Sequence, residues 1–128
     1  MFNVDSINKD KKNNGVWADF EGGSFLIAYA SKMSFQRELA RLQQPYARKI
    51  DKGTIDPKIS LDILAEALSK HVLLDWKNVG ANGEEIEYTP EIAKKVIIAN
   101  DELRGFVSDF SIELENFKQE ALEEEGKP

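Results

Sequence analysis

Few side chains in this sequence could carry out chemistry. The chain has 128 residues, its single histidine is His71, and it contains no cysteine. A catalytic histidine needs a positioned nucleophile and an orienting acid, and no serine or acid is spaced around His71 as in a known triad. Without cysteine, disulfides, thiolate zinc sites and a cysteine nucleophile are excluded. We therefore expect a protein that is not an enzyme.

The acidic residues and the glycines form no recognisable metal or phosphate motif. Asp5, Asp10 and Asp19 lack the alternate spacing and the closing glutamate of a calcium loop, and one histidine cannot begin a zinc site. The Gly22-Gly23 pair lies between two strand-like runs, and the glycines of residues 80–83 follow a helix, so neither cradles phosphate at a helix start. We expect no metal and no cofactor.

The composition is that of an ordinary folded domain. Hydrophobic residues make up 41% of the chain and charged residues 31%, close to average globular values. This length suits one hydrophobic core, so we expect a single domain over residues 1–128. No apolar run approaches the ~18 residues of a membrane span, and the first residues lack a signal-peptide core. These features predict a cytosolic protein without a membrane partner.

The charges are divided unevenly along the chain. Residues 1–60 hold ten Lys/Arg and seven Asp/Glu, a net +3, whereas residues 61–128 hold seven and sixteen, a net −9; together they give −6. Opposite potentials steer association, so copies of the chain could meet head to tail. The alternative is an acidic face that contacts only solvent.

Nucleic-acid binding is suggested by the basic stretch from Lys32 to Lys58, in which Tyr46 could stack on a base. This stretch is interleaved with acids, and the net charge of the whole chain is −6. Nucleic-acid binders are usually strongly basic. We therefore do not expect a nucleic-acid partner.

The N-terminal part predicts an arm followed by a β-hairpin. Residues 1–13 are polar and lysine-rich, with no apolar period, so we expect a flexible arm. Two strand-like runs within residues 14–30 flank Gly22-Gly23, which predicts a hairpin. A lone hairpin is marginal in water, so its apolar face must lie on helices or on another subunit. That face carries Phe20, Phe25 and Ile27.

Helical periodicity begins at Ser34. Apolar residues follow at steps of three and four up to Tyr46, and Pro45 should end or kink this first helix near Gln44. Its exposed face carries Arg37, Arg41 and Arg48. A second helix is predicted from a Ser60 cap to Trp76. Because apolar residues cover most of its circumference, we expect this helix to lie at the centre of the fold.

The C-terminal half predicts two more helices. Asn82-Gly83 marks a turn, and Thr89-Pro90 supplies a cap and a first-turn proline for a helix ending near Asn100. A long amphipathic helix should then run from Asp101 through Ala121, before a tail at residues 126–128. We thus predict a mainly α fold: four or so helices, with residues 34–125 as the helical part and a small N-terminal β-hairpin packed on them.

One segment resembles a known family. It contains Asp75-Trp76-Lys77-Asn78-Val79, then Asn82-Gly83, Ile86, Tyr88-Thr89-Pro90-Glu91, Phe106 and Glu115-Asn116-Phe117. In this order the segment resembles the tail assembly chaperones of long, non-contractile-tailed (siphovirus-type) bacteriophages. The likeness covers residues 75–117, and the N-terminal half only in general pattern; the lysine-rich arm has no counterpart.

The resemblance implies a protein of the host cytoplasm that is absent from the mature virion. It would bind the tape-measure protein, keep it soluble, help to recruit tail-tube protein and act as a homo-oligomer, in a ring or a filament. Such chaperones are commonly made in two lengths by a ribosomal frameshift, and this chain would be the short form. A structural tail-completion component and a nucleic-acid-binding accessory protein are the alternatives.

A binding protein of this kind acts through surfaces. The charge pattern and the uncovered hairpin direct attention to residues of the hairpin, the first helix and the last helix. We predict an interaction surface formed by Phe20, Phe25, Ile27, Arg37, Arg41, Arg48, Phe110 and Phe117.

Overall fold

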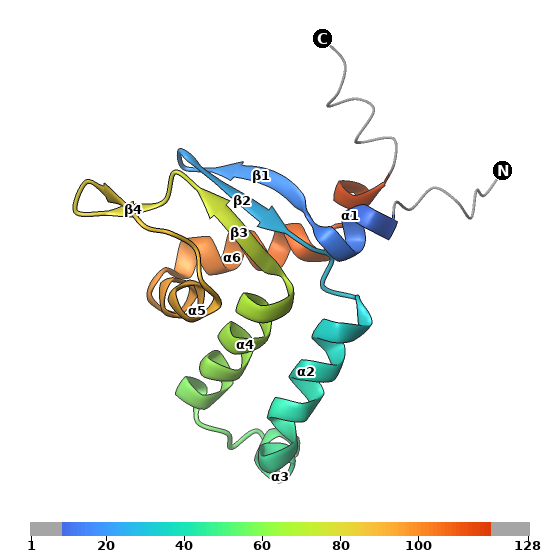
Figure 1. Ribbon diagram of the computed structural model, residues 1–128. Helices are drawn as coiled ribbons and strands as arrows, with labels where there is room; N and C mark the ends of the chain where they lie inside the picture. The colour runs from blue at the N-terminus through green and yellow to red at the C-terminus, as the bar shows by residue number, and fades with distance from the viewer. Residues whose placement is uncertain (1–8, 119–128) are drawn as a thin grey trace, which may run out of the picture.

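The computed structural model describes residues 9–118, in which helices pack behind and below a small antiparallel sheet (Figure 1). The fold is therefore mixed α and β, not mainly α with a hairpin alone. The elements in chain order are α1 (Lys9–Asn14), β1 (Val16–Phe20), β2 (Gly23–Ile27), α2 (Met33–Gln43), the 3-10 helix η1 (Gln44–Tyr46), α3 (Ala47–Asp51), α4 (Pro57–His71), β3 (Leu73–Lys77), β4 (Gly80–Ala81), β5 (Glu84–Glu85), α5 (Pro90–Ala99), α6 (Asp101–Ile112) and the 3-10 helix η2 (Leu114–Phe117).

The N-terminal hairpin has a tight two-residue turn. Strands β1 and β2 pair in register from Val16↔Ile27 to Phe20↔Gly23. The turn residues are Glu21 and Gly22, with φ of 48° and 87°, as in the type I′ turn that matches strand twist. The predicted hairpin is confirmed, but Gly23 belongs to β2 and not to the turn.

A third strand follows α4. The helix ends at His71, and β3 pairs antiparallel with β2, so the sheet order is β1-β2-β3. The predicted helix to Trp76 is wrong in its last turn. A short apolar run suits a buried strand as well as a helix, and here β2 offers an edge on which Trp76 lies opposite Phe25 and Leu73 opposite Ile27.

The start of the described chain is helical, which corrects the expected flexible arm for residues 9–13. Helix α1 is joined to later elements: Tyr29 donates its backbone N–H to Lys12 O at 3.0 Å, and Lys11 Nζ donates to Lys118 O at 3.2 Å. Both ends of the described chain therefore lie side by side (Figure 1). The rest of the expected arm, residues 1–8, lies outside the described residues.

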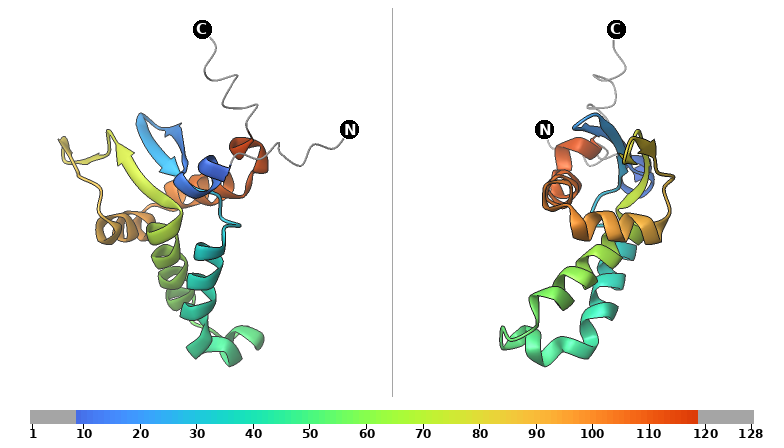
Figure 2. Two further views of the ribbon diagram at one scale, coloured as in Figure 1. Left: turned by 45° about the vertical axis from the view of Figure 1, so that its right-hand side comes forward. Right: turned by 90° about the vertical axis from the view of Figure 1, so that its left-hand side faces the viewer.

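Helices α2, η1, α3 and α4 form a helical hairpin that projects from the sheet (Figure 2). We call residues 33–64 the projection. As predicted, Pro45 ends the first helix, and α2 stops at Gln43. The start of α4 differs from the prediction: Asp56, not Ser60, is the cap, accepting from the Lys58 backbone N–H at 2.9 Å, with Pro57 in the first turn.

Two helices and a 3-10 turn complete the fold. The predicted Thr89 cap of α5 is confirmed, since its hydroxyl accepts from the Ile92 backbone N–H at 3.1 Å. The predicted long last helix is wrong, because α6 ends at Ile112 and Glu113 is extended. Asn116 Nδ2 then donates to Phe110 O at 3.0 Å, holding η2 across the helix end. The expected helix beyond residue 118 lies outside the described residues.

The core lies between the sheet and helices α4, α5 and α6. Its largest fully buried apolar side chains are Ile27, Leu68, Val72, Leu73, Ile97, Val107 and Phe117. Within residues 9–118, no helix is both long enough and apolar enough to span a membrane.

Candidate interaction surface

The apolar residues of the predicted surface are buried in the core or packed against it. Phe25, Ile27 and Phe117 are 4%, 0% and 0% exposed. Phe20 is half-buried and stacks on the ring of Phe106 at 4.6 Å, and Phe110 is half-buried with its ring 5.9 Å from that of Phe117. This corrects the prediction for Phe25, Ile27 and Phe117, which are buried. Within the chain, α6 packs on the hairpin, where Phe106 stacks on Phe20.

The basic residues of the predicted surface are exposed, and the structure places them together on the projection. Arg37 and Arg41 lie on α2, and Arg48 lies on α3. The projection, residues 33–64, contains six Lys/Arg and four Asp/Glu, while residues 84–115 contain nine Asp/Glu and three Lys/Arg. The charge division of the sequence thus becomes a basic projection on a body whose C-terminal half is acidic.

The projection carries a hollow with an apolar floor and a charged rim. The hollow has a volume of about 410 Å³. Its walls come from α2, η1 and α4. The lining residues are Arg41, Leu42, Pro45, Tyr46, Lys58, Ile59, Asp62 and Ile63.

A second, smaller hollow of about 150 Å³ lies beside the same helix pair. It is lined by Leu39, Gln43, Ile50, Ile55, Ser60, Ile63 and Leu64. Ile63 contributes to both hollows, so the two flank one contact between α2 and α4. The projection therefore leaves much of its apolar surface within reach of another molecule.

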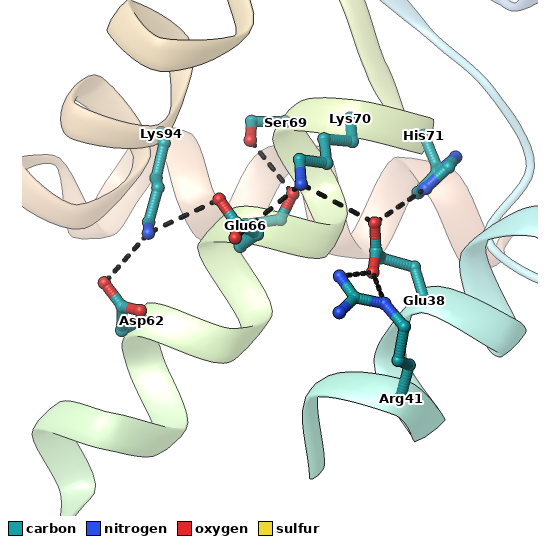
Figure 3. Close-up of polar contacts among 8 residues, drawn as sticks. All are labelled: Glu38, Arg41, Asp62, Glu66, Ser69, Lys70, His71 and Lys94. Atoms are coloured by element: carbon teal, nitrogen blue, oxygen red, sulfur yellow. Dashed lines mark hydrogen bonds and ion pairs between the residues drawn. The ribbon is translucent and has the colours of Figure 1, made fainter. Parts of the chain in front are cut away.

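A polar network fixes the base of the projection to the body (Figure 3). The side chain of Glu38 on α2 is 12% exposed and accepts a hydrogen bond from Arg41 Nε at 2.8 Å. Its carboxylate also lies 3.5 Å from His71 Nε2 and 3.7 Å from Lys70 Nζ on α4. The hydrogen bond from Arg41 is the main cause that lowers the pKa of Glu38, and it outweighs desolvation.

The same network continues to α5. Lys94 Nζ lies 3.1 Å from Asp62 Oδ1 and 3.5 Å from Glu66 Oε1, and Glu66 is also 3.7 Å from Lys70 Nζ (Figure 3). Desolvation opposes the charge of Lys94, but the carboxylates of Asp62 and Glu66 outweigh it and raise the pKa of Lys94. Opposite charges therefore alternate from α2 through α4 to α5.

This network suits anchoring better than proton transfer. A general acid needs a raised carboxyl pKa, whereas the lowered pKa of Glu38 keeps it ionised. Sequence reasoning assigned no role to His71, because its partner Glu38 is distant in the chain; only the Glu66–Lys70 spacing of four residues was a local signal. Residues 9–118 contain no cluster of three or more potential metal-binding side chains.

The segment from Asp75 onward has a visible structural role. Trp76 Nε1 donates to Ile86 O at 2.7 Å, and its ring meets that of Tyr88 edge-on at 5.3 Å. The Tyr88 hydroxyl lies 2.5 Å from Leu73 O and 2.9 Å from Ser69 O. Burial, together with the charges of Asp75 and Glu91, raises the pKa of Tyr88 to about 12. These side chains tie the loop after β3 to the core.

Together the fold and surface define a small α/β domain with a projecting, basic helical hairpin. The chain belongs to a family described as YdaY prophage protein, whose model matches residues 29–127. It is therefore a phage-derived protein. The matched range contains the projection and the body after β2, while β1 and β2 precede it. No curated protein matches the chain. No solved structure matches it either.

Proposed function

We propose that this protein is a tail assembly chaperone that binds the tape-measure protein and keeps it soluble while tail-tube protein is recruited. It acts in the host cytoplasm and is left out of the mature virion. Two points support this proposal: the chain belongs to a phage-derived family, and residues 75–117 resemble such chaperones.

The observation that carries the proposal is the apolar hollow on the projection, whose rim holds two cations, Arg41 and Lys58, and one acid, Asp62. Leu42, Tyr46 and Ile59 form apolar walls, with Arg41 and Lys58 beside them. An amphipathic helix can place its apolar stripe in such a groove. The apolar stripe of the tape-measure protein would be shielded there, and acidic residues beside the stripe would meet the two cations. Shielding of this kind keeps an amphipathic chain soluble and needs no cofactor.

Co-expression with the tape-measure protein tests the proposal. The wild-type chain should keep its partner in the soluble fraction and co-purify with it. Lys58→Glu should reduce the co-purified partner several-fold, because Lys58 is exposed at the rim and a rim charge contributes to association. Lys95→Glu is the matched control, since Lys95 is exposed on α5 and does not line this hollow.

The same experiment can reject the proposal. If the tape-measure protein stays insoluble and unbound beside the wild-type chain, the chaperone function is wrong. If Lys95→Glu and Lys58→Glu weaken binding equally, the hollow is not the binding site. Detection of the chain in purified virions would favour a structural tail-completion component instead.

A further inference from the structure

The two edges of the three-stranded sheet differ. At the β3 edge, two backbone groups bond to side chains of the same chain: Leu73 O contacts the Tyr88 hydroxyl, and the Trp76 backbone N–H donates to Asp75 Oδ1. The edge at β1 pairs with β2 alone within residues 9–118. An open edge presents backbone groups that can pair with another chain.

The register of the hairpin identifies the open groups. Phe20 and Gly23 flank the two-residue turn, and in such hairpins this pair is hydrogen-bonded. Alternation along the strand then directs the backbone N–H and C=O of Ala18 toward β2, and those of Trp17 and Asp19 away from it. Trp17 and Asp19 therefore present the free donors and acceptors of the edge.

Strand β1 carries few of the features that protect an exposed edge, and Asp19 is its one charged side chain. Natural edges are commonly blunted by proline, lysine or a bulge, but β1 contains no proline and no lysine, and the irregular register of the sheet lies between β2 and β3. The side chain of Trp17 on this strand is 40% exposed. A large exposed aromatic beside unpaired backbone is typical of an interface anchor.

The outer face of the edge is complementary to itself. Lys77 Nζ lies 4.3 Å from the centroid of the Trp17 ring. On the same face Asp19 is exposed and accepts a hydrogen bond from Ser24 Oγ at 2.7 Å. The ammonium of Lys77, which reaches from β3 over the Trp17 ring, and the carboxylate of Asp19 on β1 thus lie on one outer face of the sheet. An antiparallel copy of β1 would place each of these charges near its opposite.

We propose that β1 pairs antiparallel with β1 of a second copy, about a two-fold axis at Ala18, and joins the two sheets into one. Trp17 of each copy then lies opposite Asp19 of the other, and these residues exchange the free backbone hydrogen bonds. Asp19 of one copy then lies near the Lys77 ammonium of the other copy, which is the ammonium over that copy's own Trp17 ring. The two Ala18 residues meet at the axis, where strands come closest and small side chains fit.

This interface differs from the head-to-tail contact suggested by the charge division. A two-fold interface uses the same patch on both subunits, so it closes at a dimer instead of extending into a filament. It is also independent of the proposed function, because β1 lies in the sheet, whereas the hollow is lined by residues of α2, η1 and α4. Figure 1 shows these helices extending away from the sheet. Either proposal can therefore fail without the other.

Sedimentation velocity of the full chain, with charge reversals at the two positions, tests the pairing. Wild type should form a concentration-dependent dimer. Asp19→Lys and Lys77→Glu should each raise the dissociation constant roughly tenfold or more, because each alone places like charges together. A mixture of the two variants should dimerise again, because the mixed dimer restores an opposite pair at both contacts. Glu84→Lys and Lys95→Glu are matched controls at exposed positions away from β1.

The mixture of Asp19→Lys and Lys77→Glu distinguishes a loss of strand pairing from a loss of folding, because a misfolded variant would not regain dimerisation when the other variant is added. Circular dichroism of each single variant checks that the fold is kept. A wild-type chain that stays monomeric at every concentration would overturn the proposal. So would single variants that dimerise like wild type, or a mixture that stays monomeric.

Discussion

The carboxylate of Glu38 lies 3.5 Å from the Nε2 atom of His71, and this contact joins α2 to the last turn of α4. Arg41 and Lys70 place further positive charge around the same carboxylate. The contact lies at the base of the projection, where it holds α2 and α4 together (Figure 3). The position of the hollow relative to the body therefore depends on an acid whose charge is maintained by its neighbours.

Glu38→Gln should lower the free energy of unfolding by about 1 kcal/mol at neutral pH, because it weakens a charged hydrogen bond and ion pairs whose basic partners, Arg41 and Lys70, are exposed to solvent. The pKa of Glu38 is lowered in the folded protein from its usual 4.5, mainly by the hydrogen bond from Arg41. A lowered folded pKa contributes stability that is fully present above about pH 4.5 and is lost as the pH falls through the folded value. Urea unfolding at a series of acidic pH values should show that the difference in free energy of unfolding between wild type and Glu38→Gln becomes smaller as the pH falls.

Glu84→Gln is the control for this measurement, since Glu84 is exposed on β5. If Glu38→Gln and Glu84→Gln lose the same free energy of unfolding, with the same pH dependence, the anchoring role of Glu38 is wrong.

Phe117→Ala should destabilise the protein by about 3–5 kcal/mol, the usual loss for a buried phenylalanine. Phe117 is fully buried, with ring contacts to Tyr29 at 5.0 Å and Phe110 at 5.9 Å. Leu114→Ala in the same 3-10 helix is the control, because Leu114 is 41% exposed. Thermal or urea unfolding measures both. Similar small losses would show that Phe117 lies on a surface, as the sequence alone predicted.

Asp56→Ala should cost about 1 kcal/mol, the usual value for loss of a helix cap. The Asp56 carboxylate accepts the Lys58 backbone N–H at the start of α4. Ser60→Ala should change stability by less than about 0.5 kcal/mol, because Ser60 is exposed within the helix and caps nothing. Equilibrium unfolding of the two variants distinguishes the caps, and a larger loss for Ser60→Ala would reverse the assignment.

Tyr88→Phe should cost about 1 kcal/mol, because it removes the hydroxyl that contacts Leu73 O and Ser69 O. The pKa of Tyr88 is raised from 10.0 to about 12, first by burial and then by nearby acids. A raised folded pKa contributes stability that is fully present below pH 10 and is lost as the pH rises toward 12.

An ultraviolet titration of tyrosinate, compared between wild type and Tyr88→Phe, checks this value. The difference curve should have its midpoint near 12. A midpoint near 10, the ordinary value, would show that the Tyr88 hydroxyl is solvated.

The parts of the fold that were predictable depend on local chemistry. The stop of α2 before Pro45, the Thr89 cap and the Asn82-Gly83 turn follow from the backbone preferences of a few adjacent residues. The hairpin was predictable for the same reason, since Gly22 favours the turn. The exposed arginines of the projection also followed from helical spacing.

Non-local contacts decided the remainder. The run from Leu73 to Lys77 can extend a helix or form a strand, and the free edge of β2 selects the strand. Phe117 has the spacing of a helix stripe, but α6 ends at Ile112 and η2 turns the ring into the core. Glu38 and His71 meet because α2 and α4 pack side by side. The amino-acid sequence by itself determined the turns at Gly22 and at Asn82-Gly83 and the cap at Thr89, because these depend on adjacent residues. Burial and the pairing of distant residues were decided only by the tertiary structure, because they depend on which elements pack together in the core.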